Sequence, residues 1–135
     1  MLLPNKTAVI TGCKKGIGKA LLEEFSKNGA NIFACVRKVD DEFQSIIKKI
    51  QDKNKNEIYP VEIDLSNEQN VIKGAKEILA KKIPIDILIN NAGVVFSSIF
   101  QMTTSSKYKE IFDINFHSQI LLTQFIIKAM IKNKN

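Results

Sequence analysis

Three glycines near the N-terminus have the spacing of a phosphate-binding loop. The stretch from Thr11 to Gly18 reads Thr-Gly-Cys-Lys-Lys-Gly-Ile-Gly, so its glycines are Gly12, Gly16 and Gly18. Glycine has no Cβ, and a glycine-rich loop can therefore turn tightly and lie close against a ligand. An apolar run precedes this loop and a helical pattern follows it, which is the context in which such a motif indicates phosphate binding.

The helix expected to begin at Gly16 would direct its unpaired N–H groups and its positive dipole end at this loop. The expected occupant is an anion, most simply the pyrophosphate of a dinucleotide. The spacing is Gly-x-x-x-Gly-x-Gly, whereas the commoner fingerprint is Gly-x-Gly-x-x-Gly. Taken alone, the stretch also fits an ordinary turn between a strand and a helix.

Apolar runs alternate with helical patterns along the chain and predict the elements that hold the loop. Buried strands are expected at 6–11, 31–36, 58–64 and 85–89. Helices are expected at 16–28 and over 105–132. Two more are expected between them, one after a cap at Asp40 or Asp41 and the other after a cap at Ser66 or Asn67. Such alternation produces parallel βαβ units with right-handed crossovers. The predicted fold class is therefore α/β, a doubly wound parallel sheet in three layers, αβα.

The length of 135 residues fits a single domain. We expect residues 1–135 to be the N-terminal, cofactor-binding part of that domain, incomplete at its C-terminus, because the sequence stops where a fifth strand should begin. Pro60 is expected near the start of its strand or at an irregularity.

The predicted helix 105–132 is apolar on nearly every side. A helix of this kind must be covered on more than one side. The sheet can cover one side, and the other needs more chain or a partner subunit. We therefore expect a homo-oligomer that forms through this helix.

The positive net charge does not indicate a nucleic-acid partner. It amounts to +6, from 20 Lys and Arg against 14 Asp and Glu, and is spread along the chain. A solvated lysine-rich surface accounts for it, and base-reading and stacking motifs are absent. No apolar run is long enough to span a membrane, and we see no secretory signal. Cys13 and Cys35 lack metal-ligand spacing, and we interpret them as signs of a reducing, cytoplasmic setting. We interpret the single histidine, His117, as a surface or interface residue.

Several motifs together resemble the short-chain dehydrogenase/reductase family, and most closely its 3-oxoacyl-acyl-carrier-protein reductases. The motifs are the glycine loop, Asp64-Leu65, Asn90-Asn91-Ala92-Gly93 and Asn115, in the family's order and rough spacing over the whole chain. The resemblance implies a Rossmann fold that binds NAD or NADP and transfers a hydride between the nicotinamide and a carbonyl or alcohol. A small carbonyl compound or acyl thioester would be the substrate.

For the cofactor, the resemblance implies that Gly12, Gly16 and Gly18 shape the pyrophosphate loop and that the backbone of Ile17 lies nearby. It implies that the Asp64 carboxylate accepts a hydrogen bond from the adenine amino group, with Leu65 contributing its backbone. Asp64 could instead cap the helix that follows it.

Further along the chain, the resemblance places Asn91, Ala92 and Gly93 beside the adenosine ribose, although this stretch could also be a plain turn after a strand. Asn90 is expected to bond the backbone of the neighbouring strand. Ile114 is also assigned to the cofactor site.

Asn115 resembles the family's catalytic asparagine, whose backbone carbonyl helps to hold a water in the proton relay from the active-site lysine. It is expected in the middle of a helix and within apolar surroundings. The alternative is a core-facing asparagine that bonds a neighbouring turn.

The end of the second strand favours NADP over NAD, which remains possible. NAD enzymes usually place an acid there, but this chain has Arg37, and Lys15 precedes Gly16. A 2′-phosphate requires such cations. Asp40 and Asp41 lie too far along to replace the acid. Alternatively, Lys15 and Arg37 are solvent-facing charges.

The family's catalytic Tyr-x-x-x-Lys pair does not occur here, since Tyr59 is followed four residues on by Ile63 and Tyr108 by Phe112. We therefore expect the full-length protein to be an NADPH-dependent reductase and the isolated chain to be inactive. The alternatives are a catalytically silent NADP-binding module, acting as a sensor or interaction subunit, and a truncated product without function.

Overall fold

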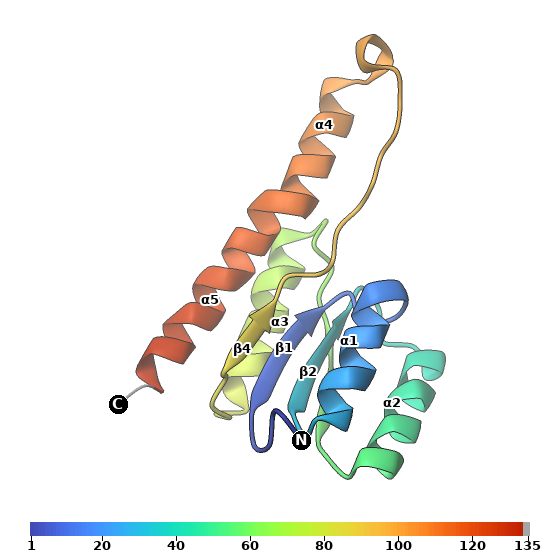
Figure 1. Cartoon of the computed structure of the whole chain (residues 1–135). Coiled ribbons are helices and arrows are strands. Elements are labelled where there is room, and N and C mark those ends of the chain that lie inside the picture. Colours follow the sequence, from blue (N-terminus) through green and yellow to red (C-terminus); the bar gives the residue numbers. More distant parts are fainter. Residues whose placement is uncertain (134–135) are drawn as a thin grey trace.

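Four parallel strands form the sheet on which the chain is built. In the computed structural model, which describes residues 1–133, they are β1 (Thr7–Thr11), β2 (Asn31–Val36), β3 (Ile58–Glu62) and β4 (Ile87–Ile89). The order across the sheet is β3-β2-β1-β4, and each neighbouring pair is parallel (Figure 1). The chain thus runs outward from β1 to β3 and then crosses back to place β4 on the other side of β1. This reversal produces a topological switch point at the carboxyl ends of β1 and β4.

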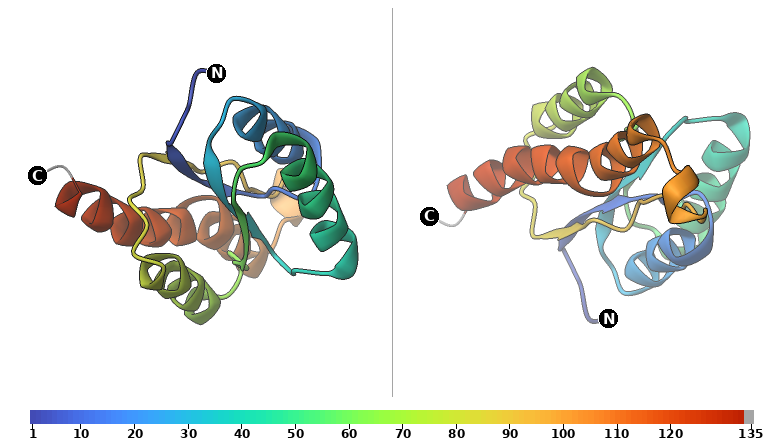
Figure 2. Two further views of the ribbon diagram at one scale, coloured as in Figure 1. Left: turned by 90° about the horizontal axis from the view of Figure 1, so that it is seen from below. Right: turned by 90° about the horizontal axis from the view of Figure 1, so that it is seen from above.

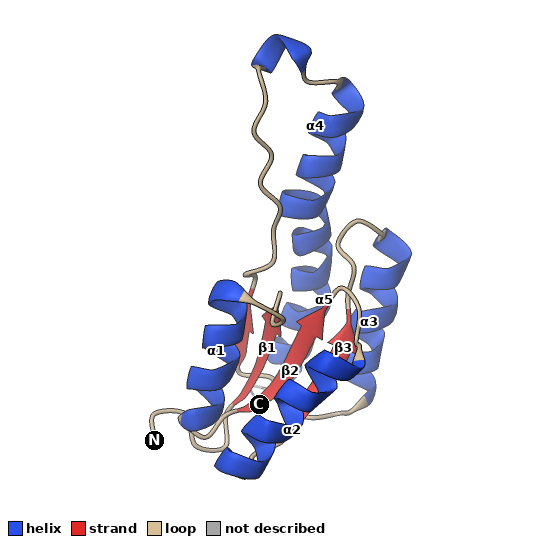
Figure 3. Cartoon of the chain, turned by 90° about the vertical axis from the view of Figure 1, so that its right-hand side faces the viewer, coloured by secondary structure: helices blue, strands red, loops and turns tan. Residues whose placement is uncertain are grey.

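The helices cover both faces of this sheet. They are α1 (Gly16–Lys27), α2 (Asp41–Asn54), α3 (Glu68–Ala80), α4 (Ser105–Phe112) and α5 (Ser118–Lys132). Helices α1 and α2 lie on one face, and α3 and α5 lie on the other (Figures 2 and 3). The predicted doubly wound α/β fold in three layers is confirmed.

The core is divided by the sheet into two apolar clusters. Every residue of β1 is buried, as expected for a parallel strand that is covered on both faces. Ile10 packs with Leu22 and Phe43 on the side of α1 and α2. Val9 packs with Val71 and Leu122 on the side of α3 and α5.

Element bounds differ from the predicted ones mainly at the strands. The strands expected at 58–64 and 85–89 are shorter than predicted and span Ile58–Glu62 and Ile87–Ile89. Pro60 lies inside β3 rather than near its start, and it pairs with Ala34. Proline is tolerated there because β3 is an edge strand, where a missing N–H group removes no ladder bond on the open side.

The predicted helix 105–132 is a continuous helical rod that contains a π-helical segment. Residues Asp113–His117 form this segment between α4 and α5, and the rod extends beyond the carboxyl edge of the sheet (Figure 1). Leu122 and Ile126 are buried, whereas other large apolar side chains are exposed, namely Phe112, Phe116, Ile120, Ile127 and Ile131. The sheet side of the rod is therefore covered as expected, and cover for the other side by a partner remains a prediction. Within residues 1–133, no helix is both long enough and apolar enough to cross a membrane.

Asp86 ties the starts of β1 and β4 together and should do so only while charged. Its Oδ2 accepts from the N–H of buried Thr7 at 2.9 Å, and Lys6 Nζ lies 3.0 Å from its Oδ1. The Thr7 N–H group, and to a lesser extent Lys6, hold the pKa of Asp86 below its ordinary 3.8. A carboxyl group with a lowered pKa stabilises the fold above its unfolded pKa, and this contribution is lost as the pH falls through the folded pKa.

We expect Asp86→Ala to lower the free energy of unfolding by roughly 1 to 2 kcal/mol at pH 7, because the Thr7 N–H loses its acceptor. In urea titrations this difference should shrink as the pH is lowered below about 4. Asp52→Ala, which removes an exposed carboxylate from α2, is the matched control and should have little effect. If Asp86→Ala lowers the free energy of unfolding by the same amount at pH 7 and in acid, this role of the Asp86 charge is contradicted.

Candidate functional site

The glycine loop follows β1 at the switch point, and two of its glycines are required by close packing. A Cβ on Gly18 would lie 1.9 Å from the carbonyl oxygen of Gly12 and 2.6 Å from Nδ2 of Asn91. A Cβ on Gly12 would lie 2.9 Å from the same Nδ2. Gly16 is different, because a Cβ there would meet no atom within 4 Å, so this glycine faces open space. Gly12 and Gly16 also have positive φ angles, of 75° and 57°.

The N-terminus of α1 lacks the cap that the other loop-preceded helices have. The residues directly before α2, α3 and α4 are Asp40, Asn67 and Thr104. The side chain of each accepts a hydrogen bond from a backbone N–H in the first turn of its helix. Lys15, at the corresponding position before α1, makes no side-chain cap bond. The first N–H groups of α1 therefore point toward the open side of the glycine loop without a side-chain acceptor, which is the arrangement that binds anions at helix N-termini.

Thr11 joins the end of β1 to the segment after β4. Its buried hydroxyl accepts from the backbone N–H groups of Asn91 and Ala92, each at 3.0 Å, and lies 3.4 Å from the carbonyl oxygen of Ile89. Nδ2 of Asn91 donates in return to the carbonyl oxygen of Thr11 at 2.9 Å. These bonds bring Asn91, Ala92 and the glycine loop together at one edge of the sheet.

Of the two asparagines after β4, Asn91 and not Asn90 bonds the backbone of the neighbouring strand, and the cofactor role of Asn91 stays a prediction. Asn90, which was expected to bond the neighbouring strand, donates instead to Oγ1 of Thr123 on α5 at 2.9 Å. Asn91 makes the bonds to the backbone of β1. Successive residues of an extended chain point to opposite sides, so the residue that faces β1 follows from where β4 ends.

Asn115 is exposed, and the expectation of apolar surroundings for it is wrong. Its side chain pairs with the backbone of Val94, with Nδ2 donating to the carbonyl oxygen and Oδ1 accepting from the N–H, both at 2.8 Å. A Cβ on Gly93 would lie 3.1 Å from Oδ1 of Asn115. Asn115 thus fastens the segment after β4 to the π-helical part of the rod, and such segments are frequent at functional sites.

Asp64 and Leu65 follow β3, and Leu65 contacts the rod. Oδ1 of Asp64 accepts from the N–H and the hydroxyl of Ser66, at 3.0 and 2.7 Å, while Asn67 caps α3. Asp64 therefore forms a turn before α3 and is not its cap. The carbonyl oxygen of Leu65 accepts from Oγ of Ser118 at 2.7 Å, and the side chains of Leu65 and Ile114 are buried.

The charged residues near the loop are arranged in a way that the sequence did not reveal. Lys15, Ile17 and Arg37 are exposed. Lys14 instead forms ion pairs with Asp40 and with Glu42, the latter at 3.3 Å. The hydrogen bond from Lys14 is the main cause that lowers the pKa of Asp40. Through Lys14, Asp40 is thus tied to the glycine loop. That Asp40 lies too far along to replace the acid at the end of the second strand stays a prediction.

The two cysteines are buried and the single histidine is on the surface. Burial raises the pKa of the Cys13 thiol to about 12, and burial likewise raises that of Cys35 well above its usual range. Cys13 belongs to the apolar cluster on the side of α1 and Cys35 to the cluster on the opposite face. His117 is exposed beside Phe116, as predicted. In the described part of the chain, no group of three or more His, Cys, Asp or Glu side chains could hold a metal ion.

Two further residues that sequence reasoning missed support the site from α5. Gln119 donates to the carbonyl oxygen of Ala92 at 2.7 Å, and Ser118 makes the bond to Leu65 described above. Neither has a local sequence signal, because each bond depends on how the rod lies across the sheet.

Comparison with known proteins identifies relatives along the whole chain. The sequence model of the family described as short chain dehydrogenase matches residues 6–135. The 3-oxoacyl-(acyl-carrier-protein) reductase of Buchnera aphidicola subsp. Schizaphis graminum is 29% identical over 134 residues, which cover 99% of this chain and 53% of that protein. The chain spans about half the length of the curated relatives it matches.

Solved structures resemble the fold equally well. L-sorbose reductase from Gluconobacter frateurii, solved with NADPH and L-sorbose, superposes with a TM-score of 0.90 at 26% identity, over 98% of this chain and 50% of that one. A metagenomic short-chain oxidoreductase in complex with NADP gives a TM-score of 0.88 at 26% identity, over 100% of this chain and 61% of that one.

Thr11→Val should loosen the joint between β1 and the segment after β4, because two N–H groups lose their acceptor. We expect the free energy of unfolding to fall by about 2 kcal/mol. Hydrogen exchange at the amides of Asn91 and Ala92 should accelerate more than exchange in the centre of β2. Thr11→Ser, which keeps the hydroxyl, is the control. Unchanged protection of both amides in the valine variant would show that the joint does not depend on this hydroxyl.

Proposed function

The chain belongs to the short-chain dehydrogenase family, and on this premise we propose that it is the cofactor-binding part of an NADP-dependent oxidoreductase. The observation that carries the proposal is the uncapped N-terminus of α1 behind a glycine loop at the switch point of the sheet. Both the family membership and the NADPH or NADP complexes of similar structures support it.

The residues present fit such a cofactor. The free N–H groups of α1 and the open side of Gly16 would receive the pyrophosphate, with the backbone of Ile17 beside it. Gly12 and Gly18 keep the loop close to β1 so that these groups converge.

The adenosine half would lie along the carboxyl ends of β3 and β4. Within residues 1–133 no hydrogen bond reaches Oδ2 of Asp64, and we assign it the acceptor role toward the adenine amino group. The backbone of Leu65 and the neighbouring Ile114 would border the base. Asn91, Ala92 and Gly93 would lie along the ribose, where their small size keeps the backbone accessible.

Lys15 and Arg37 are the cations assigned to the 2′-phosphate. Both are exposed, one at the glycine loop and one directly after β2. Arg37 can bind a phosphate in a bidentate manner. We therefore propose NADP as the preferred cofactor, with NAD as a weaker ligand.

Bound NADPH would supply a hydride for transfer to a carbonyl carbon. Toward that step, the chain contributes Asn115, whose backbone carbonyl we assign to holding a water of the proton relay, while its side chain fixes the adjacent segment through Val94. We place the serine and the Tyr-x-x-x-Lys pair in a segment beyond this sequence.

By similarity to the reductase of Buchnera aphidicola, 3-oxoacyl thioesters are the first substrates to test. Association through the helical rod and a cytoplasmic location complete the proposal.

Gly16→Ala should weaken NADPH binding at least tenfold, because the new Cβ enters the space assigned to the pyrophosphate. The fold should survive, since no protein atom lies within 4 Å of that Cβ, at a cost of about 1 to 2 kcal/mol for the positive φ. Gly29→Ala, at the other end of α1 with φ 92°, is the control for backbone strain. It is the more demanding change, because its Cβ would also lie 3.0 Å from Sδ of Met1. Fluorescence titration of both variants measures the dissociation constants. Equal affinities would remove the loop from the binding site.

The purified 135-residue chain should bind NADPH without oxidising it in the presence of acetoacetyl thioesters or simple ketones. The reason is that it contains no tyrosine with a lysine four residues on to protonate the carbonyl oxygen. Absorbance of NADPH at saturating substrate tests this, and steady turnover would refute it. A natural coding sequence that continues into Ser and Tyr-x-x-x-Lys would favour the reductase, and one that ends here would favour the silent NADP-binding module.

A further inference from the structure

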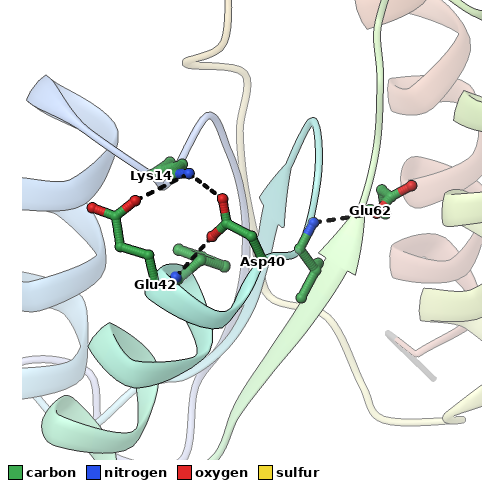
Figure 4. Close-up of polar contacts among 6 residues, drawn as sticks. Lys14, Asp40, Glu42 and Glu62 are labelled. Carbon is green, nitrogen blue, oxygen red and sulfur yellow. Dashed lines mark hydrogen bonds and ion pairs between the residues drawn. The ribbon is translucent and has the colours of Figure 1, made fainter.

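A cluster of three charged side chains, the Lys14 cluster, lies beside the glycine loop. It consists of Lys14, Asp40 and Glu42, with Nζ of Lys14 bonded to Oδ2 of Asp40 and 3.3 Å from Oε2 of Glu42 (Figure 4). The exposed fractions of the side chains are 40%, 37% and 73%. Ion pairs with this exposure contribute little to folding stability. The consequence of the cluster therefore lies in the charge that it presents to the site.

The loop that carries Asp40 is held at several points. Residues 37–40 form this β2–α2 loop, in which the N–H of Val39 donates to Oε2 of Glu62 at 3.2 Å (Figure 4). Oδ1 of Asp40 accepts from the N–H of Phe43 at 2.9 Å and caps α2. Asp40 thus uses one carboxylate oxygen for the cap and the other for Lys14. These bonds direct the acid of the loop toward Lys14 of the glycine loop, while Arg37 directly follows β2.

This arrangement puts an acid where it can influence the choice of cofactor. An acid that follows the second strand is the group that NAD sites use for the ribose hydroxyls. The same negative charge repels a 2′-phosphate. Lys14 occupies the oxygen of Asp40 that could accept from a hydroxyl, and it also neutralises Glu42. Lys14 directly precedes Lys15 in the glycine loop, so the cluster adjoins a cation assigned to the 2′-phosphate, and its effect should be largest at low ionic strength.

We propose that Lys14 masks Asp40 and Glu42 and thereby sets the preference of this site for NADPH over NADH. Lys15 and Arg37 are left to meet the 2′-phosphate. Lys14 is a positioning residue that acts through Asp40 and does not bind the cofactor itself. The inference rests on the proposed function and adds to it a determinant of cofactor choice.

The test is Lys14→Met in the purified chain, with dissociation constants for NADPH and NADH measured by fluorescence titration at low ionic strength. Exposing two carboxylates beside the phosphate should weaken NADPH binding about five- to tenfold. Binding of NADH, which lacks the phosphate, should stay the same or tighten. The ratio of the two constants is the readout, and a general loss of structure would not change it selectively.

A second variant separates masking from direct contact. Lys14→Met combined with Asp40→Asn should recover most of the NADPH affinity, since it removes the carboxylate that pairs most closely with Lys14. Asparagine caps helices about as well as aspartate, so α2 should keep its start. Lys27→Met, which removes the same charge from a lysine that pairs with Glu24 at 4.0 Å at the C-terminal end of α1, is the matched control and should leave both constants unchanged.

Equal changes for NADPH and NADH in Lys14→Met, or no change in either, would overturn the masking role. A double variant as weak as Lys14→Met would also overturn it, because Lys14 would then contact the phosphate directly. If Gly16→Ala loses NADPH while the Lys14 variants keep the ratio, the proposed function stands and only this inference fails. If the natural chain binds neither dinucleotide, both fail.

Discussion

The structure depends on one close approach, in which the end of β1, the start of α1 and the segment after β4 meet with no room for a side chain. The hypothetical Cβ on Gly18 would overlap the carbonyl oxygen of Gly12, and both glycines press against the amide of Asn91. Any other residue at Gly18 would separate α1 from the sheet. The direction of the uncapped helix N-terminus, and with it the position of the candidate site, follows from this contact.

The remaining parts of the fold fix that contact from three directions. Thr11 connects β1 to the segment after β4, Gln119 holds Ala92 from α5, and Asn115 holds Val94 from the rod. Each bond is directed at a backbone group in a segment without secondary structure. Such groups need partners when they are removed from water, and here the partners come from elements far away in the sequence. The sheet edge therefore remains ordered although few of its residues belong to a strand.

Local patterns in the sequence were enough to predict the layers and the glycine loop. Buried strands such as β1 and β2 appear as short β-branched runs, and α2 shows its cap at Asp40 and its apolar spacing directly. That Asn91 and not Asn90 bonds the backbone of β1 could not be predicted, because a shift of one residue at a strand end reverses the side to which a side chain points. The exposure of Asn115 depends on the rod extending past the sheet, which no local pattern encodes. The pairing of Lys14 with Asp40 joins residues from two loops, and only the folded β2–α2 loop brings them together.

We propose that the free amides at the start of α1 receive a pyrophosphate. Two-dimensional ¹H–¹⁵N NMR of the labelled chain, titrated with NADPH, tests this most directly. We expect the amide signals of Gly16, Ile17 and Gly18 to shift together and in proportion to saturation, along with a shift of the pyrophosphate ³¹P signals. NADPH-dependent shifts that leave these three amides unchanged, or no shifts at all, would contradict it.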